Sequence, residues 1–189
     1  MCVSALLAAL AGARDAGAFG FDDVAALARK QARAAYRPLD QKEPAELAAL
    51  NYDQYRDIRF RPEHSLWRAE NLPFEAQFFH RGAGNLRVRM NEVVAGKTHH
   101  LPYESEDFDY GKNTLSPEKW GDLDFGGFRV HYPLNGVGYK DEVIVFLGAS
   151  YFRALCAGAR YGLSTRGLAI VTVGANGEEF PRFVEFWLV

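Results

Sequence analysis

The sequence predicts a mainly β protein, an antiparallel β-sandwich with a short helical segment at its N-terminal end. Short runs of aromatic and β-branched residues recur between clusters of Gly, Pro, Asn and Asp, which is the pattern of many short strands joined by turns. Two of these runs, 87–91 and 127–131, alternate polar and apolar residues, so each strand would bury one face and expose the other. Strands do not alternate with long helices as they do in βαβ units, and antiparallel sheets are therefore expected.

Residues 1–18 are expected to be a signal peptide. Residues 1–12 form an uncharged apolar run of the length of a signal-peptide core, which is too short to span a bilayer as a helix. Small residues at 16–18 offer a cleavage site after Ala18. No Lys or Arg precedes the apolar run, which leaves two alternatives: an incomplete leader, or a buried helix rich in Ala and Leu. We favour export of the chain, with residues 19–189 as the mature part.

Two helices are expected next. Residues 21–36 carry apolar side chains at the spacing of one helix face, with Asp22 and Asp23 at the start and basic residues toward the end. Pro38 ends this segment. Residues 44–50 form a second, shorter helical pattern that begins with a proline.

From Tyr52 onward the sequence indicates strands. The run that ends at Val189 stays apolar to the last residue, which leaves two alternatives: a terminal strand at the centre of its sheet, or a chain that is a fragment of a longer protein. The expected strand segments are 57–60, 74–79, 86–94, 98–103, 125–132, 142–147, 151–155, 163–173 and 180–189.

The composition excludes several classes of partner. The 189 residues carry 22 Lys and Arg against 24 Asp and Glu, a formal charge of −2, so neither nucleic acid nor an anionic membrane surface is expected as a partner. A hydrophobic fraction of 48% is ordinary for a globular domain, and no stable membrane insertion is expected. Cys2 and Cys156 are too few for a disulfide framework, and we expect Cys156 to be buried among small apolar neighbours. No cofactor is expected.

No catalytic residue and no metal site is identified. Residues 148–152 begin like the G-x-S-x-G nucleophile elbow, but Phe152 stands where the closing glycine is required. His99 and His100 are adjacent on an expected strand, where neighbouring side chains point to opposite faces. They are therefore interpreted as solvated histidines and not as a metal-binding pair.

The glycine-rich segment 148–186 is the candidate substrate-binding segment. Planar aromatic faces, guanidinium groups and carboxylates suit a polyhydroxylated ligand, because sugar rings stack on aromatic faces while their hydroxyls require directional hydrogen bonds. The alternative is a structural ion pair between Arg166 and Glu178 or Glu179. Glu178 and Glu179 are adjacent and would diverge, so they are not expected to form an acid and base pair. The candidate residues are Tyr151, Arg153, Tyr161, Arg166, Glu178 and Glu179.

Several strings of the sequence are specific enough to indicate a family. From Phe19 to Val189 the chain resembles the periplasmic glucan biosynthesis family OpgG and OpgD, also called MdoG and MdoD. The strings that carry the resemblance are LNYDQYRDIRF (50–60), FFHRG (78–82), FGGFR (125–129), LGASYFRA (147–154), YGLSTRGLAI (161–170) and EEFPRF (178–183).

This resemblance implies a periplasmic protein whose large N-terminal β-sandwich domain is similar to galactose mutarotase-like folds and is followed by a smaller immunoglobulin-like domain. It implies a role in the biosynthesis or remodelling of osmoregulated periplasmic glucans, with a β-1,2-linked glucose backbone as the partner. Some members are endo-β-1,2-glucanases whose catalytic aspartates lie in later motifs. Residues 19–189 would then be the leading part of the large domain, and we expect no glucanase activity from this chain. The alternative is a non-catalytic periplasmic carbohydrate-binding module.

Overall fold

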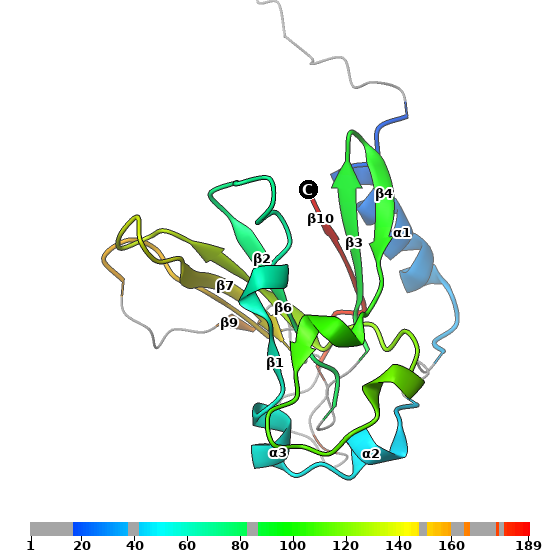
Figure 1. Cartoon of the computed structure of the whole chain (residues 1–189). Coiled ribbons are helices and arrows are strands. Elements are labelled where there is room, and N and C mark those ends of the chain that lie inside the picture. The colour runs from blue at the N-terminus through cyan, green and yellow to red at the C-terminus, as the bar shows by residue number, and fades with distance from the viewer. Residues whose placement is uncertain are drawn as a thin grey trace, which may run out of the picture.

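The prediction of a mainly β protein with antiparallel sheets is confirmed in the computed structural model (Figure 1). Within the described part of the chain the strands form a two-stranded, a three-stranded and a five-stranded sheet. Each of the nine expected strand segments overlaps a strand. The structure describes residues 17–37, 42–82, 87–147, 151–159, 165–166, 177 and 180–189.

Two of the three α-helices that the structure describes lie where the sequence predicts them. Helices α1 (Phe21–Arg33) and α2 (Ala45–Ala48) lie where they are expected, although no residue of α1 is buried. A third helix, α3 (Tyr52–Arg56), occupies a segment expected to begin the strand region, and that expectation is wrong. The reason is local, because the Asn51 side chain accepts a hydrogen bond from the Gln54 backbone N–H while the Gln54 side chain accepts one from Asn51 N–H, both at 3.0 Å. The described residues also form three 3₁₀ turns, η1 (Pro62–His64), η2 (Ser105–Asp107) and η3 (Pro117–Lys119).

The five-stranded sheet has one apolar face, and its opposite face, called the polar face below, carries charged and amide side chains beside the buried Val145. Phe78, Phe128, Phe146 and Phe152 are successive register partners across four strands, so their rings form a row on one face. The neighbouring register positions, Gln77, Arg129, Val145 and Arg153, belong to the opposite face. The sheet order is β2 (Glu75–Phe79), β6 (Gly127–Tyr132), β7 (Asp141–Leu147), β8 (Tyr151–Ala154) and β9 (Thr165–Arg166).

The three-stranded sheet contains the exception to the antiparallel pattern. It has the order β10 (Glu185–Leu188), β3 (Arg89–Val94) and β4 (Lys97–Leu101), and β10 pairs with β3 in parallel. Strand β10 therefore lies at the edge of this sheet among the described strands, not at its centre. The small sheet pairs β1 (Arg59–Phe60) with β5 (Phe108–Asp109).

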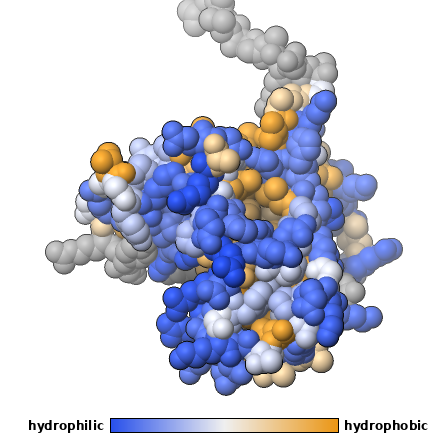
Figure 2. Space-filling model, in the orientation of Figure 1, coloured by the Kyte–Doolittle hydropathy of each residue, from blue (hydrophilic) through white to orange (hydrophobic). Residues whose placement is uncertain are grey.

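The core lies where the apolar faces of the two larger sheets meet. Met90 and Leu188 of the three-stranded sheet join Phe78 and Phe128 of the five-stranded sheet in one buried cluster. The Phe186 ring contacts that of Phe128 edge-to-face, with centroids 5.0 Å apart. Figure 2 shows hydrophobic residues between the five-stranded and the three-stranded sheet, which is the arrangement expected of a sandwich.

Of two expectations about segments outside the sheets, the one for Cys156 is tested by the structure and the one for the signal peptide is not. The expectation that Cys156 is buried is wrong, because this free cysteine is exposed just after the end of β8. Residues 1–16 of the expected signal peptide lie outside the described residues. Among the helices that the structure describes, none is long and apolar enough to cross a membrane.

Candidate functional site

The structure places three of the six candidate binding residues on neighbouring strands. Tyr151 and Arg166 are register partners between β8 and β9, and Arg153 lies two positions along β8. The other three candidates, Tyr161, Glu178 and Glu179, lie outside the described residues. The ion pair considered for Arg166 with Glu178 or Glu179 therefore stays a prediction.

The Arg153 side chain is part of a hydrogen-bonded network on the polar face of the five-stranded sheet. Its Nη2 atom donates to Glu142 Oε1 at 3.0 Å, and Arg129 Nη1 donates to Glu142 Oε2 at 3.4 Å. Arg129 also donates to Gln77 Oε1 from Nε at 3.1 Å and from Nη2 at 2.8 Å. Gln77 in turn donates to the Ser65 hydroxyl at 3.0 Å. We call these five residues, Ser65, Gln77, Arg129, Glu142 and Arg153, the arginine network.

The arginine network is fixed at one end and accessible at the other. Gln77 is 5% exposed and Ser65 6%, so this end is buried, and two bonds to Gln77 Oε1 hold the Arg129 guanidinium in place. The side chains of Arg129, Glu142 and Arg153 are 29%, 20% and 32% exposed. This end of the network is therefore partly exposed at the sheet surface.

A second ion-paired group extends the polar surface along β2. Glu75, which is buried, accepts from Lys140 Nζ at 2.7 Å and from Arg68 Nη1 at 3.0 Å. Because Glu75 and Gln77 are two residues apart on one strand, they lie on the same face of the sheet. The polar surface therefore continues from β8 across to the loops beside β2.

A hollow of about 560 Å³ adjoins the arginine network at the ends of β2 and β7. Arg129 is one of its lining residues, and its guanidinium lies 5.5 Å from the centroid of the Phe79 ring, while that of Arg56 lies 5.6 Å from the centroid of the Tyr52 ring. The lining thus combines aromatic faces with guanidinium forks, the groups that recognise sugar rings and their hydroxyls. It is formed by Tyr52, Tyr55, Arg56, Ile58, Arg59, Phe60, Phe78, Phe79, His80, Arg129 and Leu147.

The buried wall of this hollow is held by a chain of hydrogen bonds that starts at His80. Burial lowers the pKa of His80 to about 4, so the imidazole is neutral at pH 7. Its Nδ1–H donates to the Arg81 carbonyl, which can only accept, and Nε2 therefore accepts from the Tyr103 hydroxyl at 3.0 Å. The Tyr103 oxygen lies 2.7 Å from that of Tyr110, and burial raises the pKa of both phenols, that of Tyr110 to about 12. The Tyr55 hydroxyl, which lines the hollow, donates to the His80 carbonyl at 2.9 Å.

The comparison with known families decides the relationship. The family model described as "Periplasmic glucan biosynthesis protein, MdoG" matches residues 19–189. The chain belongs to the MdoG family. The resemblance carried by the sequence strings is thereby confirmed, and with it the expectation that this chain corresponds to part of a longer protein, since it spans about a third of the length of the curated relatives it matches.

Curated relatives of this MdoG-family chain share about half of its residues. Glucans biosynthesis protein G of Ralstonia nicotianae is 51% identical over 183 residues, which cover 96% of this chain and 36% of the relative. The protein of the same name from Rhodopseudomonas palustris is 54% identical over 163 residues, covering 86% and 32%. That from Shewanella frigidimarina is 48% identical over 171 residues, covering 90% and 31%.

Sequence reasoning on this MdoG-family chain missed four residues of the arginine network, namely Ser65, Gln77, Arg129 and Glu142. Gln77 lies on β2 and Arg129 on β6, both far from Arg153 in sequence, whereas Glu142 lies on β7, the strand before that of Arg153. The available signal was the alternation of residues 127–131, which places Arg129 on the face opposite Phe128. The partners of Arg129 across the sheet depend on strand register, which cannot be read from the sequence.

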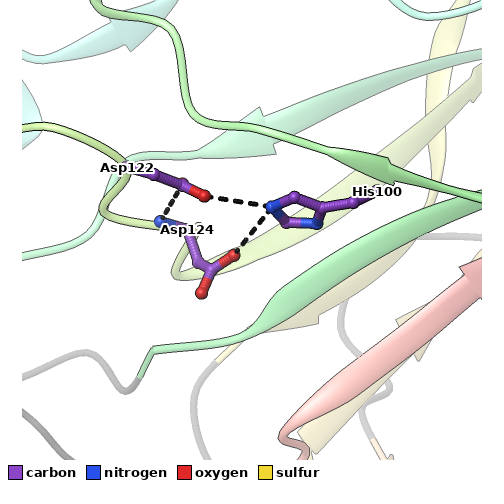
Figure 3. A group of neighbouring side chains, drawn as sticks. All are labelled: His100, Asp122 and Asp124. Carbon is purple, nitrogen blue, oxygen red and sulfur yellow. Dashed lines mark hydrogen bonds and ion pairs between the residues drawn. The ribbon is translucent and has the colours of Figure 1, made fainter.

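A second group, of potential metal ligands, lies at the three-stranded sheet. His100, Asp122 and Asp124 each bring one ligand atom within 4.8 Å of the others (Figure 3). The interpretation of His99 and His100 as solvated is correct for His99, which is exposed, and wrong for His100, which is half-buried and bonded through both ring nitrogens. This group is separate from the arginine network.

Proposed function

We propose that this chain supplies a glucan-binding surface in a periplasmic glucan biosynthesis protein, and that the arginine network with the adjoining hollow binds the glucan backbone. The names of the curated relatives and of the family support a role in glucan biosynthesis and a periplasmic location. A β-1,2-linked glucose backbone is the ligand that the family resemblance implies. The formal charge of −2 suits a neutral polysaccharide better than a polyanion.

The observation that carries this proposal is the fixed and partly exposed Arg129 guanidinium. Its bonds to described residues use one N–H at each of its three nitrogens, so two of the five N–H groups stay available to ligand hydroxyls. Because Gln77 and Glu142 hold the guanidinium in place, little side-chain entropy would be lost on binding. The Tyr52 ring, 69% exposed at the rim of the hollow, offers a face for a glucose ring.

We further propose that residues 19–189 are the leading part of a large galactose mutarotase-like sandwich domain whose catalytic aspartates lie elsewhere in the whole protein. Hydrolysis of a glycosidic bond needs two carboxyl groups that flank the scissile bond. In the arginine network, Glu142 is the sole carboxylate, and it is bonded to two guanidiniums. We therefore expect this chain to bind glucan and not to cleave it, while the whole protein is an endo-β-1,2-glucanase.

The alternative function is a non-catalytic carbohydrate-binding module. Release of reducing sugar from β-1,2-glucan by the whole protein separates the two, because a binding module releases none. In either case the role of this chain is to bind glucan, and the experiment on the chain itself is a binding measurement.

Calorimetric titration of the chain with a β-1,2-linked gluco-oligosaccharide tests the proposal. Arg129→Met removes the hydrogen bonds from the charged group, each worth about 1.5–3 kcal/mol, and should weaken binding roughly tenfold or more. Tyr52→Ala removes an exposed ring, so it should leave the melting temperature unchanged and still weaken binding severalfold. Lys97→Ala, an exposed residue of β4 outside the site, is the control and should bind like the original chain. Unchanged affinity in both site variants would contradict the proposal.

A further inference from the structure

We propose that His100, Asp122 and Asp124 form a binding site for one divalent transition-metal ion, with Zn²⁺ as the ion whose ligand preferences fit the three groups. His100 lies on β4, and the two aspartates lie in the segment that leads into β6 (Figure 3). Imidazole nitrogen and carboxylate oxygen are both common zinc ligands. This inference does not depend on the proposed glucan-binding function.

The distances between the three ligand atoms suit a single ion. His100 Nε2 lies 3.0 Å from Asp122 Oδ2 and 3.8 Å from Asp124 Oδ1, and all three atoms lie within 4.8 Å of one another. Zinc binds such atoms at about 2.0–2.2 Å, which separates tetrahedral ligands by roughly 3.3–3.6 Å. Small side-chain rotations would therefore bring the three atoms into one coordination sphere and leave a fourth position for water.

Each of the three residues is held through one atom and offers another. His100 Nδ1 donates to the Met90 carbonyl at 3.1 Å, which leaves Nε2 directed at the carboxylates. Asp122 Oδ1 accepts from the backbone N–H groups of Tyr103 at 3.1 Å and of Asp124 at 2.9 Å, so Oδ2 is the atom presented to His100. Asp124 Oδ2 accepts from Arg87 Nε. Bonds of this kind to the far side of each ligand are typical of metal sites.

The buried oxygen of Asp124 distinguishes a metal site from an ion pair. The Asp124 side chain is 4% exposed, and its Oδ1 atom has no hydrogen-bond partner among the described residues. A protonated His100 has a single Nε2–H, which points to Asp122 Oδ2 at 3.0 Å and leaves Asp124 Oδ1 at 3.8 Å without a donor. A buried carboxylate oxygen without a partner is costly, whereas one cation would satisfy all three groups.

The site would connect the two larger sheets. His100 belongs to the hairpin β3–β4. Asp124 precedes the buried Phe125, which forms an isolated β-bridge with Val88 just before β3. A metal ion bound to both segments would hold the hairpin against the start of β6. A metal ion that binds the folded state and not the unfolded state raises the melting temperature of the chain.

Titration of the chain with Zn²⁺ tests this proposal, after removal of any affinity tag and treatment with a chelator. We expect one Zn²⁺ per chain and a rise in melting temperature. Asp122→Asn keeps the oxygen that accepts the two backbone bonds and removes the ligand oxygen, and it should weaken binding at least tenfold. His99→Ala changes the exposed neighbouring histidine and should bind Zn²⁺ like the original chain.

Nitrogen-15 spectra of the imidazole rings provide an independent readout. Zn²⁺ should shift the His100 Nε2 resonance and leave that of His99 in place. Three results would overturn the proposal: no stoichiometric binding, equal affinity in Asp122→Asn, or a His100 Nε2 that keeps its proton at saturating Zn²⁺. The last result would identify an ion pair only.

Discussion

The buried His80 makes the stability of this protein sensitive to acid. In the unfolded chain a histidine gains its proton near pH 6.5, whereas in the folded chain burial lowers the pKa of His80 to about 4. Between these values the unfolded state binds a proton that the folded state does not. The stability that His80 contributes is therefore complete above about pH 6.5 and is lost progressively as the pH falls toward 4.

The size of this effect follows from the two pKa values. They differ by about 2.5, and at about 1.4 kcal/mol for each pKa step the loss of stability between pH 7 and pH 4 is about 3 kcal/mol. A typical domain has a total stability of roughly 5–15 kcal/mol, so this single side chain accounts for a measurable part of it.

Urea denaturation at several pH values between 7 and 4 measures the effect. His80→Gln cannot take up the proton, although the Gln amide oxygen can still accept from the Tyr103 hydroxyl. The variant should be less stable at pH 7, because it loses ring contacts and the bond from Nδ1 to the Arg81 carbonyl. Its stability should then fall about 3 kcal/mol less than that of the original chain between pH 7 and pH 4.

The control for this experiment is His99→Gln, which changes an exposed histidine and should leave the pH dependence unaltered. The reasoning would be refuted if the original chain and His80→Gln lost stability in parallel. Parallel curves would mean that the imidazole takes up its proton equally easily in the folded and the unfolded chain.

Two further predictions concern the backbone. Gly127 has φ +150°, and a Cβ atom there would lie 2.2 Å from the Phe146 carbonyl oxygen, so Gly127→Ala should cost at least ~2 kcal/mol in urea denaturation. Gly136→Ala, where nothing lies within 4 Å, should stay within about 0.5 kcal/mol, and equal effects would contradict the steric argument. Asn51→Ala removes the cap of α3 and should cost about 1 kcal/mol of unfolding free energy, whereas Asn51→Ser should cost only a few tenths. A large loss in the serine variant would show that Asn51 acts other than as a cap.

The strand pattern was predictable because it depends on local alternation of side chains. The segment at Tyr52 is aromatic and resembles a strand by composition, but the capping pair of Asn51 and Gln54 decides the helix there. The parallel pairing of β10 with β3 joins Glu185 to Arg89, and no local pattern indicates a partner so far away in the chain.

The site was predictable only in part for a similar reason. Arg153 was a candidate because of its residue type, but its role depends on Glu142 and Arg129 from two other strands. A register shift between Val130 and His131 decides which residues of β7 stand opposite β6. His100 and Asp122 are also brought together by tertiary structure, since each looks like an ordinary polar surface residue in the sequence.

A crystal structure of the protein with a bound β-1,2-linked gluco-oligosaccharide tests the central claim most directly. The account predicts glucose units along the polar face of the five-stranded sheet, with hydroxyls hydrogen-bonded to Arg129 and a ring against Tyr52 at the hollow. An oligosaccharide bound to another surface, with Arg129 and Tyr52 out of contact, would contradict it.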